Sequence, residues 1–179
     1  MPASDLLIVE DGTGKPDANS YVDLTTFLDF CTMYDYADVL TLEEEQQVAA
    51  LLKAKDYVET FNYRGIPTVQ DQALSFPRVE CFPVGAFLPI PSDKIPEKIK
   101  RAQMSAAVLS AQDVDLQPTI NPGGFVVKEK VGPIETQYAD GVANGMSIPV
   151  FTGVDSLLKD YIQTGIGSGG RYSLRTIRA

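Results

Sequence analysis

The chain has 179 residues with 15 basic and 24 acidic side chains, so its net charge is −9. This balance disfavours a broad nucleic-acid surface, because phosphate binding depends on Lys and Arg. The sequence has no histidine, which removes the commonest general base and the commonest transition-metal ligand.

Other features of the composition point to an ordinary globular protein. No apolar run approaches the roughly 18 residues that a membrane span needs, and the first residues lack the basic start of a signal peptide. We therefore expect a protein made in the cytoplasm, without membrane contact. Cys31 and Cys81 have no metal-binding or redox spacing, so we expect both to be reduced and buried.

The first predicted elements are a short strand over residues 6–9, a turn-rich loop and a helix that follows Asp23. Asp23 is a favourable N-cap, and we expect its helix to run to about Tyr34. Apolar residues recur along this helix at helical spacing, which predicts one buried face. They are Leu24, Phe27, Leu28 and Cys31.

A second and stronger helix is predicted to begin at a capping box formed by Thr41 and Glu44. Glutamates in its first turn complement the positive end of the helix dipole. Gly65 and Pro67 are expected to end it. The predicted buried stripe comprises Val48, Leu51, Leu52, Ala54, Val58 and Phe61.

Residues 64–95 are rich in proline and aromatic residues and show no sustained periodicity, so we predict an extended loop. We expect Arg64 and Arg78 in this loop to form salt bridges with the acidic body. Pro96 is suited to the first turn of a third helix. Its expected buried stripe is Ile99, Ala102, Met104, Ala106 and Leu109, and its expected exposed cations are Lys98, Lys100 and Arg101.

From Gly123 the apolar period changes to two, which predicts a β-hairpin over about residues 124–139 with its turn at Gly132-Pro133. Lys128, Glu129 and Lys130 are expected on an exposed strand face, with contact to a neighbouring subunit or a tail component as the alternative. A fourth helix is predicted over about residues 155–163.

The predicted fold class is mainly α with a β-hairpin (α+β). It comprises a bundle of about four helices, an extended loop rich in proline and aromatic residues, and a flexible C-terminal arm. We expect residues 1–164 to form one domain and residues 165–179 to form the arm. No catalytic residue, cofactor or metal site is predicted, so we do not expect an enzyme. A carboxylate-based enzyme that uses a divalent metal remains a minor alternative.

The expected arm contains three arginines and no acidic residue, so it carries +3. A glycine hinge followed by apolar and basic side chains is typical of a segment that binds another protein. The hinge residues are Gly165, Gly167, Gly169 and Gly170. The expected contact residues are Arg171, Tyr172, Leu174, Arg175, Ile177 and Arg178.

Two glycine motifs resemble nucleotide-binding patterns but do not meet their requirements; we interpret the first as the hinge of the arm and the second as a turn. Gly165-x-Gly167-x-x-Gly170 matches the dinucleotide-binding pattern, but a helix precedes it where that pattern needs a strand. Residues 12–15 resemble part of a phosphate-binding loop, but Val9 stands where its first glycine is required and Pro16 where Ser or Thr is required.

Several segments, taken in order, resemble a known family. They are Ala18–Val22, Asp56-Tyr57, Tyr63–Gly65, Asp71–Arg78, Ile95–Gln103 and Lys128–Glu135. This set spans roughly residues 18–140. It resembles a family of tailed-bacteriophage proteins that is often labelled DnaT-like single-stranded DNA-binding and is found among head-morphogenesis proteins.

The resemblance implies a head-to-tail adaptor of the virion neck, assembled in the host cytoplasm. Copies of the chain would form a ring, expected to be a dodecamer, that binds the portal protein through the C-terminal arm and a tail or neck protein below. Genomic DNA would pass through the channel without sequence-specific binding. The DNA-binding label fits the sequence poorly, because the sequence has no Trp, no basic groove and no interleaving of aromatic and basic residues. A single-stranded DNA-binding module in replication, with the arm as its DNA contact, remains the alternative.

Overall fold

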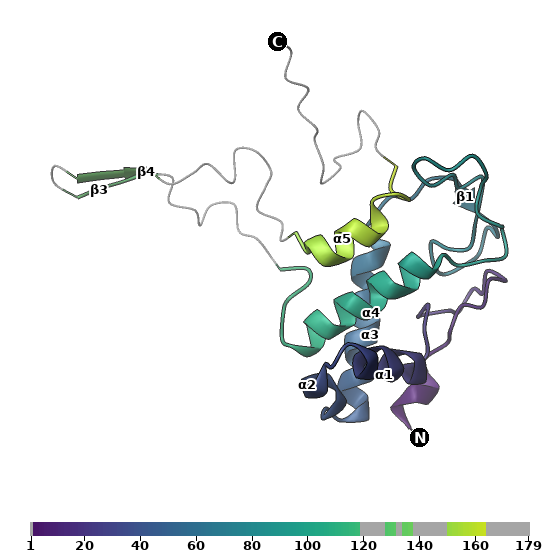
Figure 1. Ribbon diagram of the computed structural model, residues 1–179, viewed down its shortest axis with the longest axis horizontal. Coiled ribbons are helices and arrows are strands. Elements are labelled where there is room, and N and C mark those ends of the chain that lie inside the picture. Colours follow the sequence, from purple (N-terminus) through teal and green to yellow (C-terminus); the bar gives the residue numbers. More distant parts are fainter. Residues whose placement is uncertain (1, 119–127, 132–133, 138–149, 164–179) are drawn as a thin grey trace, which may run out of the picture. The chain divides into compact units, whose positions relative to one another are not determined.

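Figure 1 shows the computed structural model, which describes residues 2–118, 128–131, 134–137 and 150–163. The chain divides into two units, one made of residues 1–116 and 151–163 and the other of residues 117–150 and 164–179. The described helices belong to the first unit, and the described hairpin belongs to the second. The fold is mainly helical with a small antiparallel hairpin, which confirms the predicted α+β class.

The helices of the first unit, in chain order, are η1 (Ala3–Leu6), α1 (Leu24–Met33), α2 (Ala37–Leu40), α3 (Glu44–Glu59), α4 (Glu97–Ala111) and α5 (Thr152–Leu158). Helix α4 packs across α3, and α5 packs on α4 (Figure 1). Small buried residues of α4, Ala102, Ala106 and Ala107, allow the helices to approach closely. The predicted stripes of α3 and α4 form much of the core, although Leu52 and Leu109 are only half-buried.

The start of α1 is as predicted, because the Asp23 side chain accepts a hydrogen bond from the Thr26 amide at 2.7 Å. The start of α3 is not. Its capping box is formed by Glu43 and Gln46, and the Glu43 amide donates to Gln46 Oε1 at 3.1 Å. Thr41 instead ends the short helix α2, which was not predicted, and its hydroxyl donates to the Asp38 carbonyl.

Three further boundaries differ from the prediction. Helix α3 ends at Glu59, before the glycine and proline expected to stop it. Helix α5 runs over Thr152–Leu158, so it begins and ends earlier than the predicted 155–163. The expected strand over 6–9 is replaced by η1 and by a single parallel bridge between Val9 and Ser20.

The segment from 64 to 95 is largely irregular, as predicted, with one short ribbon. Strand β1 (Ile66–Pro67) pairs antiparallel with β2 (Arg78–Val79). The expected salt bridge of Arg78 is wrong, because its guanidinium donates to the backbone carbonyls of Tyr63, Arg64, Gly65 and Ser75. Carbonyls in irregular backbone need donors, and a guanidinium supplies several in one plane. Likewise, Arg64 Nε donates to the Ile162 carbonyl at 3.1 Å.

The described part of the second unit is the hairpin of β3 (Lys128–Val131) and β4 (Ile134–Gln137). Its register pairs Lys128 with Gln137 and Val131 with Ile134, so the turn falls at 132–133 as predicted. The outer parts of the predicted strands lie outside the described residues. The contact expected of Lys128, Glu129 and Lys130 with a neighbour stays a prediction.

Candidate nucleic-acid interface

The first two turns of α4 are unusually basic. Lys98, Lys100 and Arg101 all lie there, and Lys94 precedes the helix. The dipole makes the N-terminal end of a helix unfavourable for positive charge, so helix stability does not explain this cluster. Lys98 and Arg101 are exposed and one helical turn apart, which places them on the same face.

An aromatic cluster adjoins this basic face at Arg101. The Nη2 atom of Arg101 donates to the hydroxyl of Tyr34 at 2.8 Å. Tyr34 caps the end of α1 and is 50% exposed. Its ring lies 4.6 Å from the ring of Phe30 and is nearly parallel to that of Tyr36, with 6.3 Å between centroids. The cluster therefore presents a supported ring next to a guanidinium.

The basic face is connected at Lys98 to an exposed apolar loop. Lys98 Nζ forms an ion pair with Asp160 Oδ2 at 2.7 Å, and the Asp160 carbonyl accepts from the amide of Val84 at 2.9 Å. Val84 belongs to the loop 82–90, which also carries Phe87, whose side chain is 99% exposed. A phenyl ring left so fully in water is available for contact with a ligand.

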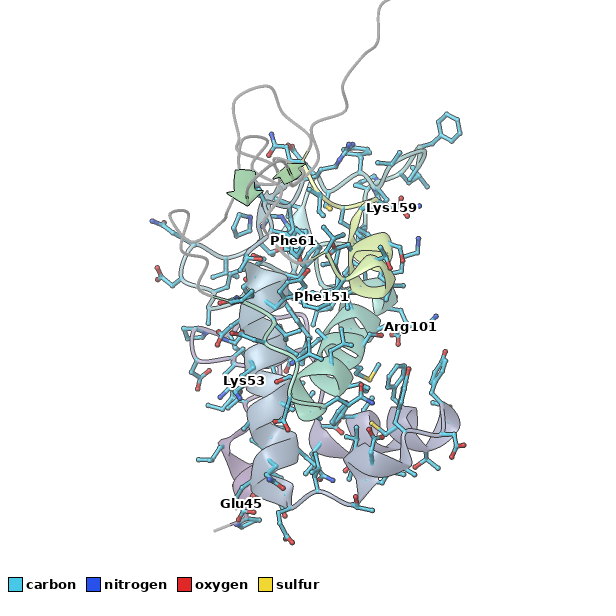
Figure 2. All side chains as sticks on the ribbon, turned by 90° about the vertical axis from the view of Figure 1, so that its left-hand side faces the viewer. Glu45, Lys53, Phe61, Arg101, Phe151 and Lys159 are labelled. Atoms are coloured by element: carbon cyan, nitrogen blue, oxygen red, sulfur yellow. The ribbon has the colours of Figure 1, made fainter. Side chains whose placement is uncertain are left out.

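We group the exposed rings and cations of these segments as the α4 strip, defined as Tyr34, Phe87, Lys98, Arg101 and also Lys159, the exposed lysine that ends α5. Figure 2 shows Lys159 and Arg101 on the same side of the body, along α5 and α4, whereas Lys53 lies on the α3 side. An aromatic ring and a cation thus meet at Tyr34 and Arg101, although these residues come from separate segments of the sequence. This is the combination that single-stranded nucleic-acid surfaces use.

The acidic charge of the chain is unevenly distributed. Residues 1–60 hold 13 acidic and 3 basic residues, a net charge of −10, whereas residues 61–179 hold 11 acidic and 12 basic residues, a net charge of +1. The net charge of the whole chain therefore says little about α4 or α5. At the Tyr34 end, acids such as Asp35 and Asp38 adjoin the cluster, so a phosphate path is confined to the Arg101 and Lys98 side.

The loop at 12–15 is a turn, as predicted, and its amides are already occupied. The Glu10 carboxylate accepts from the amides of Gly12 and Gly14, both at 2.9 Å, and from that of Lys15 at 2.7 Å. Gly12 has a φ of +102°, and a Cβ atom there would meet the Asp93 carbonyl oxygen. The backbone donors that suggested a phosphate loop therefore hold a carboxylate of the same chain.

No metal or thiol chemistry is visible in the part of the chain that the structure describes. It contains no group of three or more His, Cys, Asp or Glu residues that could hold a metal ion. Cys31 and Cys81 are free and buried, as predicted. Burial raises the pKa of the Cys31 thiol to about 11, which keeps it protonated and unreactive at neutral pH.

No described helix has the length and apolar character that would let it cross a membrane.

The residues predicted as a contact site from sequence are not those that form the strip. The arm and its hinge, from Gly165 to Arg178, lie outside the described residues. Lys98 and Arg101 were predicted only as exposed positions of a helix, and Tyr34 and Phe87 were not singled out. Their signal in the sequence is weak. It consists of cations near the N-terminal end of a helix, where the dipole disfavours positive charge, and of a phenylalanine in an irregular loop.

Comparison with known proteins gives one match. The model of a family described as "Putative DnaT-like ssDNA binding protein" matches residues 6–179. Neither the curated proteins nor the solved structures contain a significant match to the chain.

This match overturns the adaptor interpretation. The family is described by single-stranded DNA binding, which contradicts the predicted location in the virion neck. It also contradicts the predicted partners, namely a portal protein, a tail protein and further copies of the chain in a ring. It also conflicts with DNA that passes without being bound. The resemblance rested on short segments, none specific alone. Net charge and the lack of interleaving along the sequence are poor guides to such a site, because folding brings Tyr34 to Arg101.

Proposed function

The chain belongs to the DnaT-like ssDNA-binding protein family, and from this premise we propose that it binds single-stranded DNA along the α4 strip. Phosphates contact Lys98, Arg101 and Lys159, and bases stack on Tyr34 and Phe87. The observation that carries the proposal is a pair of contacts on one face of α4: Lys98 is joined through Asp160 to the loop 82–90, and Arg101, one helical turn further on, is joined to Tyr34.

The exposed rings favour a single strand over a duplex. Phe87 at 99% exposure and Tyr34 at 50% exposure offer faces on which an unpaired base can stack. In a duplex the base faces are already stacked on one another, so a duplex offers the strip only its phosphates. Stacking also tolerates any base, so we propose binding with little sequence preference.

The acidic remainder of the chain supports such a site. Residues 1–60 carry a net charge of −10 and repel phosphate, which directs a strand toward the cations of α4 and α5. Residues 165–179 add Arg171, Arg175, Arg178 and Tyr172 without any acid, which is a composition suited to the same ligand. We propose a binding role without a chemical step, in the processing or replication of DNA that exposes single strands.

The test is fluorescence anisotropy of a labelled oligothymidine, titrated with the full chain at several salt concentrations. Three phosphate contacts predict a slope of log affinity against log salt of about −2, from roughly −0.7 for each contact on a single strand. A duplex of the same length should bind more weakly. Failure to bind oligothymidine at low salt, or tighter binding of the duplex, would contradict the proposal.

A further inference from the structure

We infer that Asp160 is an internal competitor for DNA phosphate, which holds Lys98 until a strand displaces it and so sets the affinity of the strip. The inference rests on the proposed function. In this proposal the cations of the strip bind phosphate, whereas Asp160 competes with phosphate for Lys98.

Asp160 contacts the strip directly at Lys98. Its carboxylate oxygen is 2.7 Å from Lys98 Nζ, with side-chain exposures of 50% for Lys98 and 24% for Asp160. Hydrogen bonding and charge attraction from Asp160 raise the pKa of Lys98, so Lys98 keeps its positive charge at neutral pH. Among the described residues, Lys98 is the strip's one cation that belongs to an ion pair, since Arg101 donates to Tyr34.

The backbone of Asp160 is held independently of its side chain. Its carbonyl accepts from the Val84 amide, and the neighbouring Tyr161 carbonyl accepts from the Arg64 amide at 2.8 Å. The carboxylate can therefore leave Lys98 by side-chain rotation while the loop 82–90 stays anchored. A strand phosphate would then take the place of the carboxylate on Lys98.

The exchange has a modest cost. An exposed ion pair contributes about 1 kcal/mol or less, so a phosphate held by several other contacts can displace it. The released carboxylate remains close to the bound phosphate and repels it. Both effects lower affinity. The acid also raises selectivity. An anion that contacts Lys98 alone gains little binding free energy, because it must first displace Asp160. A strand also contacts Arg101 and stacks a base, so its net gain is larger.

The experiment compares D160N with wild type in oligothymidine binding at low salt. Asparagine keeps the size of the side chain and the backbone contact to Val84 but removes the competing charge. We expect affinity to rise about two- to fivefold, which corresponds to the worth of one exposed ion pair. The gain should be smaller when Lys98 is also replaced, in K98M/D160N compared with K98M, because only the repulsion between Asp160 and nearby phosphate is then removed.

The matched control is Asp56→Asn, which removes one charge from another exposed ion pair, that of Lys55 with Asp56 on α3. An equal gain in D56N, or no gain in D160N while wild type binds, would overturn the role of Asp160 and leave the proposed function intact. A gain of the same size without Lys98 would also overturn it. Wild type that does not bind at all would overturn the proposed function itself.

Discussion

Replacing Lys98 and Arg101 together by glutamate should weaken binding of oligothymidine by about 50-fold at 50 mM salt. Each phosphate contact on a single strand contributes roughly 0.7 to the slope of log affinity against log salt. Relative to 1 M salt, this amounts to nearly tenfold in affinity per contact at 50 mM. The slope itself should fall in magnitude by about 1.4, and anisotropy titrations at four salt concentrations measure both quantities. Neither side chain is buried, so the melting temperature should change little.

The control for charge alone is Lys53→Glu, compared with Lys98→Glu as a single change. Lys53 is exposed on α3 and lies away from the strip (Figure 2). Both variants make the chain more negative by the same amount, so a purely long-range effect would weaken binding equally. We expect K98E to weaken binding several-fold more than K53E, and equal losses would mean that the strip is not the site.

Replacing Phe87 by alanine should weaken binding of the same oligonucleotide by about 5- to 150-fold, the range expected when one stacked base is lost at 1–3 kcal/mol. No charge changes, so the salt slope should stay at the wild-type value. This combination separates stacking from phosphate contact. Because the side chain is 99% exposed, the free energy of unfolding should be unchanged.

The matched control for this change is Leu88→Ala. Leu88 is the next residue in the loop, is 78% exposed and is apolar but not aromatic. If the loop binds only through general apolar contact, F87A and L88A will lose similar affinity. If Phe87 stacks on a base, F87A will lose more, and Phe87→Trp will restore binding.

Local signals were sufficient to predict most of the helical body. The Asp23 cap, the proline before α4 and the turn at 132–133 each follow from the chemistry of one or two residues. The start of α3 was misplaced because Thr41 and Glu43 are both plausible caps, and only tertiary context, the formation of α2, separates them. Short helices without an apolar stripe leave little pattern to detect.

The strip could not be read from the sequence in the same way. Its rings and cations come from the end of α1, the loop 82–90, α4 and the end of α5. Periodicity reports which face of one element is buried, but not which elements become neighbours. The contact of Arg101 with Tyr34 arises only when α1 and α4 pack together, so the lack of interleaving along the chain was uninformative.

The central claim is the location of the DNA, and crosslinking tests it most directly. Oligothymidine that carries 5-iododeoxyuridine, irradiated with the full chain, forms covalent bonds with side chains against which the base lies, and mass spectrometry identifies the peptides. The account predicts adducts on the peptides that contain Phe87 and Tyr34, lost when excess unlabelled oligothymidine competes. Adducts confined to residues 165–179, or adducts on α3 formed in the same yield as those on the strip, would contradict it.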